Sequence, residues 1–159
     1  MTTATKNIKL KEVKTIDTLK ITRVKSNFER VKITSSRTAN EVLRLFVDLD
    51  TIDYVESSHI LTLDRQNMVT GYKLLGVGGD CSCVMDIKVI AQTALLSGAS
   101  GIILAHNHPS GNINPSNEDI KITSQAKAAL KLINIELLDH IILTDTTYCS
   151  LSDEGKLNY

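Results

Sequence analysis

The chain has 159 residues, a formal net charge of zero and an apolar content of 42%, with 4% aromatic residues and no tryptophan. This length suffices for one domain with a single core, and the composition is not that of a disordered chain. No apolar run reaches the ~18 residues needed to cross a membrane, and residues 1–11 lack the apolar segment of a signal peptide. A cytoplasmic protein that does not enter a membrane is therefore expected.

Residues 1–31 are rich in lysine and threonine with scattered apolar residues. They are consistent with an edge hairpin, a partner-binding arm or a mobile tail, and we separate them from a domain at 32–159. At the start of that domain, Thr38 and Glu41 have the spacing of a capping box and predict the beginning of a helix. One face of this helix would carry the apolar residues Val42, Leu45, Phe46 and Leu49.

A hairpin and a second helix follow in the sequence. A strand is expected over 56–63, a turn over 64–67 and a returning strand over 68–76. A short strand is expected around 81–85. Asp86 is placed to cap a largely buried helix that runs through Ser97, and Gly98 fits the end of that helix.

Three cysteines are present, an odd number that does not complete a set of disulfides. Cys81 and Cys83 are two residues apart and could bind a metal together. Structural zinc would need two further ligands, and Cys149 is the only other cysteine in the chain. Small buried or edge thiols are therefore expected at these positions.

The second half of the chain begins with a continuously apolar, β-branched run at 101–105, which predicts a strand buried on both faces. A helix is expected from about 116 to 132, and strands over 135–143 and 148–151 close the domain. Hairpin spacing early and a helical crossover later predict an α/β fold with a mixed central sheet flanked by helices.

Two histidines stand at the end of the buried run. Because side chains two residues apart on a strand share a face, His106 and His108 can direct both imidazoles at one point. Pro109 and Gly111 then break the strand. A zinc site needs about three protein ligands and an open position, and the third candidate is Asp119.

Asp119 has two interpretations. Ser116 and Asp119 have the spacing of a capping box, which is a common structural feature at the start of a helix. However, Asp119 also lies one turn before Ile122, on the apolar stripe of the helix. A carboxylate that faces the interior needs a compensating charge, and a zinc ion would supply it. We therefore predict Zn²⁺ at His106, His108 and Asp119, with Ser116 as the helix cap.

These residues resemble a known signature. His-x-His, seven residues, Ser, two residues and Asp is the JAMM motif of the JAB/MPN metalloproteases. The strings His-Asn-His-Pro-Ser-Gly at 106–111 and Leu-Asp-His-Ile-Ile at 138–142 resemble the RadC branch in particular. The resemblance extends from about 32 to 155 and implies a central sheet flanked by helices, related to the cytidine-deaminase fold. Deamination is not expected, because those enzymes need His-x-Glu and Cys-x-x-Cys.

The resemblance also implies a glutamate upstream, near the start of a strand, as general acid and base. Glu56 is the best match, although the sequence alone would class it as a solvated residue at a strand edge. Ser116 would help to hold the tetrahedral oxyanion. His140 is either a core histidine bonded to backbone or acid, or a residue that contacts the zinc ligands. His59 is expected to be an ordinary strand residue.

The function expected from this pattern is zinc-dependent hydrolysis of a peptide or isopeptide bond in an unknown protein or peptide substrate. The alternative is a DNA repair or recombination accessory factor that acts as a binding module, since RadC-like proteins carry that label. Zero net charge weighs against duplex binding, while the lysine-rich start keeps it open. RadC-like proteins often have a helix-hairpin-helix region before this domain, and the short form expected here has none. A metal-free scaffold is disfavoured because all the ligands are retained.

Overall fold

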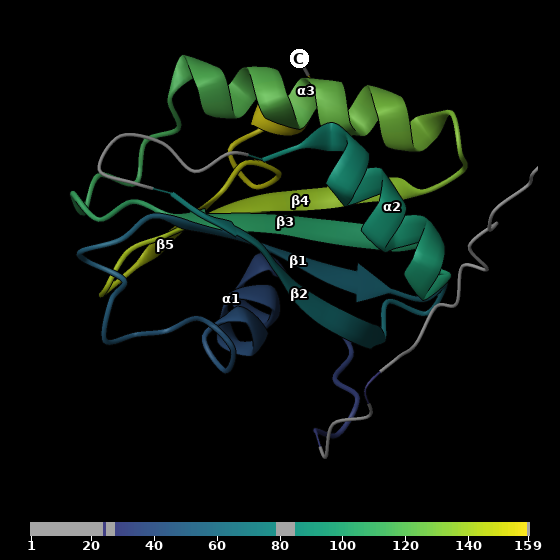
Figure 1. The fold of residues 1–159 in the computed structure, drawn as a ribbon, viewed down its shortest axis with the longest axis horizontal. Helices are drawn as coiled ribbons and strands as arrows, with labels where there is room; N and C mark the ends of the chain where they lie inside the picture. The colour runs from purple at the N-terminus through teal and green to yellow at the C-terminus, as the bar shows by residue number, and fades with distance from the viewer. Residues whose placement is uncertain (1–23, 25–27, 79–84, 159) are drawn as a thin grey trace, which may run out of the picture.

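A computed structural model describes residues 24, 28–78 and 85–158 and contains one five-stranded mixed sheet (Figure 1). The strands are β1 (Ser57–Leu63), β2 (Val69–Val77), β3 (Gly101–Asn107), β4 (Glu136–Leu143) and β5 (Tyr148–Ser150). Their order across the sheet is β2-β1-β3-β4-β5, with β3 and β4 parallel and the other neighbours antiparallel. The predicted α/β fold with a mixed sheet is confirmed.

Three α-helices cover the two faces of this sheet. They are α1 (Ser36–Leu43), α2 (Ile87–Ser97) and α3 (Asn117–Lys131), and a short 3-10 helix η1 (Lys156–Asn158) ends the described chain. Figure 1 shows α2 and α3 on one face and α1 on the other. Each face has its own apolar cluster, so β3 in the centre is buried from both sides. α3 is the crossover that joins the parallel strands β3 and β4.

The alternation of side chains along β3 determines which residues lie on each face of the sheet. Ile102 and Leu104 pack with α2 and α3, whereas Ile103 and Ala105 pack with α1. The predicted buried strand is therefore confirmed, and it continues for two more residues than the apolar run. By the same alternation, the side chain of residue 106 belongs to the face of α2 and α3, and that of residue 107 to the face of α1.

A register shift in β4 brings His140 to the same face as His106. Ile102 pairs with Leu137, but Ile103 pairs with Asp139, so Leu138 is an extra residue in the ladder. The side chain of Leu138 packs close to Gly101, where a Cβ would lie 2.9 Å from Leu138 Cδ1. After this bulge, residue 140 faces α3.

The first helix differs from the sequence prediction. α1 begins at Ser36, with Ser35 as its N-cap, and the Ser35 side chain accepts from the Thr38 amide. The capping box predicted at Thr38 is therefore wrong. The helix ends at Leu43 because the chain tightens there, with amides bonded to carbonyls three residues back. The helical phase is lost after this point, so the predicted apolar face is also wrong at Leu45 and Leu49, which are 59% and 48% exposed.

The remaining elements lie within a residue or two of the predicted ranges. Asp86 caps α2 by accepting from the Lys88 amide at 2.7 Å, and Gly98 ends it with a φ of 65°. Residues 81–84, including two of the cysteines, and most of the 1–31 segment lie outside the described residues. Val31 and Ile33 pair with the chain at the start of β2. Within the described ranges, each helix is too short or too polar to span a lipid bilayer.

Candidate metal centre

His106 and His108 lie where β3 ends, on the face covered by α3. His106 is the sixth residue of the strand and is 1% exposed, while the His108 amide continues the ladder by bonding to Leu143 O at 2.9 Å. The two Nε2 atoms are 2.9 Å apart. The predicted convergence of the two imidazoles is therefore seen in the structure.

Asp119 reaches the same point from the first turn of α3. Its Oδ1 lies 3.1 Å from His106 Nε2, and its Oδ2 lies 3.5 Å from His108 Nε2. The ligand atoms of all three residues lie within 4.8 Å of one another. The spacing and the atom types suit a metal ion with nitrogen and oxygen ligands, such as zinc.

The capping box and the ligand cluster use the same carboxylate. Ser116 is the N-cap of α3: its Oγ accepts from the Asp119 amide at 3.1 Å, while its own amide donates to Asp119 Oδ2 at 2.7 Å. The Ser116 hydroxyl also donates to Oδ2 at 2.7 Å. The two interpretations of Asp119 are thus compatible, because the cap holds the carboxylate in the position from which it faces the histidines.

Hydrogen bonding fixes which His108 nitrogen is a donor. His108 Nδ1 lies 2.6 Å from Asn112 O, and a carbonyl oxygen can only accept. The proton of a neutral His108 is therefore on Nδ1. Its Nε2 consequently presents a lone pair to Asp119 and His106.

A buried chain of hydrogen bonds fixes His106 in the same way. Thr123 Oγ1 lies 2.5 Å from both Asp119 O and His140 Nδ1. The carbonyl must receive the single hydroxyl proton, so His140 Nδ1 donates to Thr123. His140 Nε2 then accepts from His106 Nδ1 at 2.9 Å, and His106 Nε2 is left with a lone pair. Burial holds the pKa of His140 well below its usual value, which keeps this imidazole neutral.

Three acceptors therefore meet at one point without a donor between them. Two imidazole lone pairs and a carboxylate repel one another unless a cation lies among them, and a metal ion or a proton can fill this position. Burial alone would raise the pKa of Asp119, but when Nε2 of His106 or His108 carries a proton, the resulting hydrogen bond outweighs burial and holds this pKa well below its usual value. The hydrogen bond with Asp119 raises the pKa of His108. The donor set fits a zinc ion.

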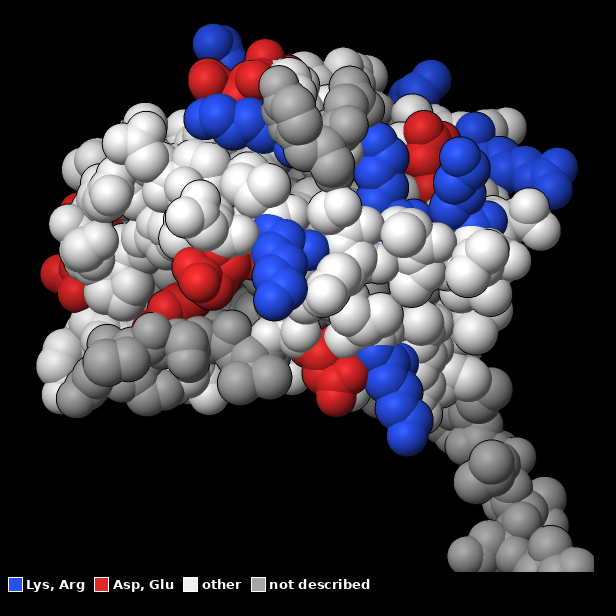
Figure 2. All heavy atoms as spheres, turned by 90° about the horizontal axis from the view of Figure 1, so that it is seen from above, with Lys and Arg blue, Asp and Glu red and all other residues white. Residues whose placement is uncertain are grey.

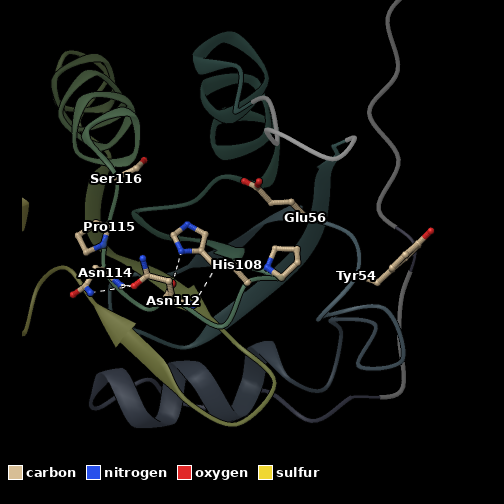
Figure 3. A pocket seen from close by; sticks show the side chains of 9 residues that line it. Tyr54, Glu56, His108, Asn112, Asn114, Pro115 and Ser116 are labelled. Carbon is tan, nitrogen blue, oxygen red and sulfur yellow. Dashed lines mark hydrogen bonds between the residues drawn. The ribbon is translucent and has the colours of Figure 1, made fainter.

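A cavity of about 450 Å³ opens beside this centre. Its walls include Glu56, His108 and Ser116, and Figure 3 shows Glu56 and Ser116 on opposite sides of the His108 ring. Tyr54, which is exposed, points away from them. The structure thus brings together Glu56 and Ser116 with the three candidate ligands, although Glu56 was singled out only by resemblance.

Three residues in or beside the site had not been predicted from the sequence. Thr123 lies one helical turn after Asp119, so its place could have been found from helical spacing. Asn107 and His59 gave no local signal. His59, expected to be an ordinary strand residue, is buried in β1, and its ring nitrogens lie 2.8 Å from Ser57 Oγ and 2.9 Å from Tyr72 Oη.

Comparison with known proteins identifies the family of this chain. Residues 33–156 match the family described as RadC-like JAB domain. UPF0758 proteins of Flavobacterium johnsoniae, Clostridium acetobutylicum and Aquifex aeolicus are 37%, 39% and 37% identical over 78%, 82% and 85% of this chain. The matches cover 53%, 56% and 57% of those relatives, so the chain spans a little more than half of their length. The chain belongs to the RadC-like JAB domain family.

Proposed function

We propose that this domain is a zinc-dependent hydrolase of the JAMM type that cleaves a peptide or isopeptide bond. The observation that carries the proposal is the meeting of three acceptors, from His106, His108 and Asp119, at the edge of an open cavity. A set of acceptors without a donor, buried at His106 and partly exposed at His108 and Asp119, favours a cation, and the open side leaves room for water and substrate. A purely structural metal site would be closed by a fourth protein ligand.

Each residue around the cavity has a chemical task in this proposal. When bound, the zinc ion would polarise the scissile carbonyl and lower the pKa of the attacking water. Glu56 takes the proton of this water on its carboxylate and passes it to the leaving amine. Asp119, His106 and His108 hold the metal and do not exchange protons with the substrate.

Ser116 would donate a hydrogen bond to the oxyanion that forms on the substrate carbonyl. Its hydroxyl lines the cavity but donates at present to Asp119 Oδ2. When substrate binds, the Ser116 side chain must therefore rotate about its Cα–Cβ bond, or its hydroxyl proton must reorient toward the substrate. Asp119 would keep the bond from the Ser116 amide during this change.

Elemental analysis of the purified protein tests the metal part of the proposal. We expect about one zinc per chain in the wild type and little in His108→Ala, because the site loses one of its three ligands. His59→Ala is a matched control, since it removes a buried histidine of the same sheet that does not contact the cluster. Equal zinc content in wild type and His108→Ala would disprove the site.

A screen of peptide and isopeptide libraries tests the catalytic part. Cleavage by the zinc-loaded protein, abolished by a chelator and restored by zinc, is the expected result. A zinc-loaded protein that cleaves nothing in either library would leave a metal-binding domain without the proposed activity. The identity of the substrate would follow from the residues that flank the cleaved bonds.

A second candidate function is DNA association, as a repair or recombination accessory factor. Residues 1–31 contain eight lysine and arginine residues but three aspartate and glutamate residues, which favours contact with phosphates. The face in Figure 2, by contrast, carries acidic and basic side chains interspersed. We expect weak binding that falls steeply with salt and disappears when residues 1–30 are removed. Tight binding by a chain that lacks them would favour the DNA function over hydrolysis.

A further inference from the structure

Asn107 lies between the two candidate histidine ligands but serves the opposite face of the sheet. It is the last residue of β3 and is fully buried. Its Nδ2 donates to Ile52 O at 2.6 Å and to Val55 O at 2.8 Å. Its Oδ1 accepts from the Ser57 amide and from Ser57 Oγ, both at 2.8 Å. A side-chain amide has two N–H donors and two lone pairs, so its hydrogen-bonding capacity is complete.

All four partners belong to the short segment 52–57, which carries Glu56. Two are carbonyls that precede Glu56, and two are groups of the residue that follows it. The Glu56 carbonyl itself accepts from the Gly78 amide at 2.8 Å. Because this segment has no regular ladder of its own before β1 begins, Asn107 supplies the bonds that define its path.

We propose that Asn107 is a positioning residue that fixes Glu56 relative to the metal ligands. Within three consecutive residues, His106 and His108 direct their imidazoles to the ligand cluster, and Asn107 directs its amide to the segment that carries Glu56. A single stretch of backbone, buried between β1 and β4, therefore sets the distance between metal and carboxylate. This inference rests on the proposed function in treating Glu56 as the proton carrier, for which an error of about 1 Å in position is costly.

A second set of hydrogen bonds holds Asn107 and Ser57 in place. Ser57 Oγ donates to Asn107, so it must accept from His59 Nε2. His59 Nδ1 then accepts from Tyr72 Oη at 2.9 Å, which is the shorter of the two contacts open to this hydroxyl, since Phe46 O lies 3.4 Å away. This assignment needs a neutral imidazole, and burial, followed by the charge of His106, lowers the pKa of His59 to about 4. We call these four residues, Tyr72, His59, Ser57 and Asn107, the Asn107 network. It joins β2, β1 and β3.

The structure distinguishes this positioning from general stabilisation, because the bonds of Asn107 are confined to one segment. Removing them should displace or loosen residues 52–57 and leave the ligand cluster unchanged. The cluster has its own supports on the other face, through His140, Thr123 and the cap of α3. A merely structural role would instead weaken both faces together.

The experiment compares wild type with Asn107→Leu, which has a similar volume but no hydrogen bonds. Each protein is loaded with Co²⁺, and the pseudocontact shifts of the backbone amides are measured by NMR. We expect one metal per chain in both, with altered or broadened signals for Val55 and Ser57 and unaltered shifts for Ile141 in the adjacent strand. Amide exchange over 52–57 should quicken by roughly tenfold or more. Thr62→Val, which removes another buried hydroxyl of β1, should change none of these signals.

Unchanged shifts and exchange at Val55 and Ser57 in Asn107→Leu would overturn the inference. If that variant does not fold, Asn107→Asp and Ser57→Ala decide the matter, because the first loses the two donated bonds and the second the hydroxyl bond. Both should alter the same two amides to a smaller extent, and unaltered amides in both would overturn the inference. If the signals change as expected but the wild type cleaves no peptide, the positioning stands and the hydrolytic function fails. With a substrate in hand, Asn107→Leu should lower kcat without changing KM or zinc content.

Discussion

The two faces of the sheet at the end of β3 carry polar groups in opposite states. On the face of α3, the two imidazoles and the carboxylate present only acceptors to one another, and the set is incomplete without a cation. On the face of α1, the Asn107 amide makes all the hydrogen bonds that it can with the chain itself. The difference shows how the end of one strand can serve two purposes. Polar groups without hydrogen-bond partners can bind a ligand, whereas the polar groups of Asn107, which are fully hydrogen-bonded, hold the neighbouring backbone in place.

Substitution of a candidate metal ligand should give the largest effect on zinc content, and it should alter only the face of the sheet that α3 covers. In Asp119→Asn the charge is lost while the shape is kept, and we expect zinc content to fall from about one per chain to near zero, with turnover lost as well. Elemental analysis after dialysis measures this. Asp86→Asn is the control, because it changes an aspartate at the start of α2 that caps its helix without contacting the cluster. Retention of zinc by Asp119→Asn would remove Asp119 from the ligand set.

Glu56→Gln should separate proton transfer from metal binding most clearly. The amide cannot take a proton, so we expect kcat to fall by roughly 10²–10⁴-fold, the usual loss when general acid and base catalysis is removed. Zinc content should stay at the wild-type level, since Glu56 is not a ligand in the proposal. Steady-state kinetics on a cleavable peptide, with metal analysis of the same samples, makes the comparison. A variant with full rate would leave the mechanism without its base.

Removal of the Thr123 hydroxyl should have an intermediate effect, limited to metal binding. Thr123→Val breaks the bond from His140, so the His106 tautomer is no longer fixed, and zinc affinity should fall by about 10–100-fold. Competition with a chromogenic chelator measures the affinity. Thr93→Val is a matched control, because the Thr93 hydroxyl of α2 donates to a carbonyl four residues back, as that of Thr123 does. Equal losses in both variants would show that the effect is general helix destabilisation.

His59 should contribute a smaller, pH-dependent effect from the other face. Its pKa is lowered to about 4 in the folded chain from 6.5, chiefly by burial. The unfolded chain therefore binds a proton between pH 6.5 and 4 that the folded chain excludes, and the free energy of unfolding falls as the pH falls through this window, by at most ~3 kcal/mol. His59→Gln should flatten this dependence. Denaturant unfolding in the presence of a chelator tests it, and an unaltered slope would contradict it.

Much of the binding face could be predicted from the sequence because its signals are local. The apolar run before His106 fixes a buried strand, and alternation then places His108 on the same side. Helical spacing from Ile122 gave the inward direction of Asp119. Each of these inferences needs only a few neighbouring residues, which is why the strand and the helix were predicted within one or two positions and the three side chains that meet in the structure could be named as candidate ligands.

The positioning face could not be predicted in the same way because its bonds join distant segments. Asn107 binds backbone groups about fifty residues earlier in the chain, and no pattern in the sequence marks a carbonyl as a partner. Glu56 lies in an irregular segment, where no helical or strand periodicity distinguishes it from the other acidic residues. The start of α1 was misjudged for a different reason: Ser35, Ser36 and Thr38 all suit an N-cap, and their residue types alone do not single out Ser35, which is the cap in the structure.

The cap at the start of α3 has an electrostatic consequence beyond holding Asp119. Peptide dipoles along the fifteen residues of this helix add up to a partial positive charge at its first turn, and Ser116 at that end lines the cavity. The effect is worth about 0.3–1 kcal/mol for a charge close to a helix end. An anion that forms in the cavity would therefore gain from the helix as well as from a metal, whereas a neutral mimic of the same shape would gain from neither charge. Tetrahedral anionic inhibitors should bind in preference to their neutral isosteres, even when each fills the cavity equally well.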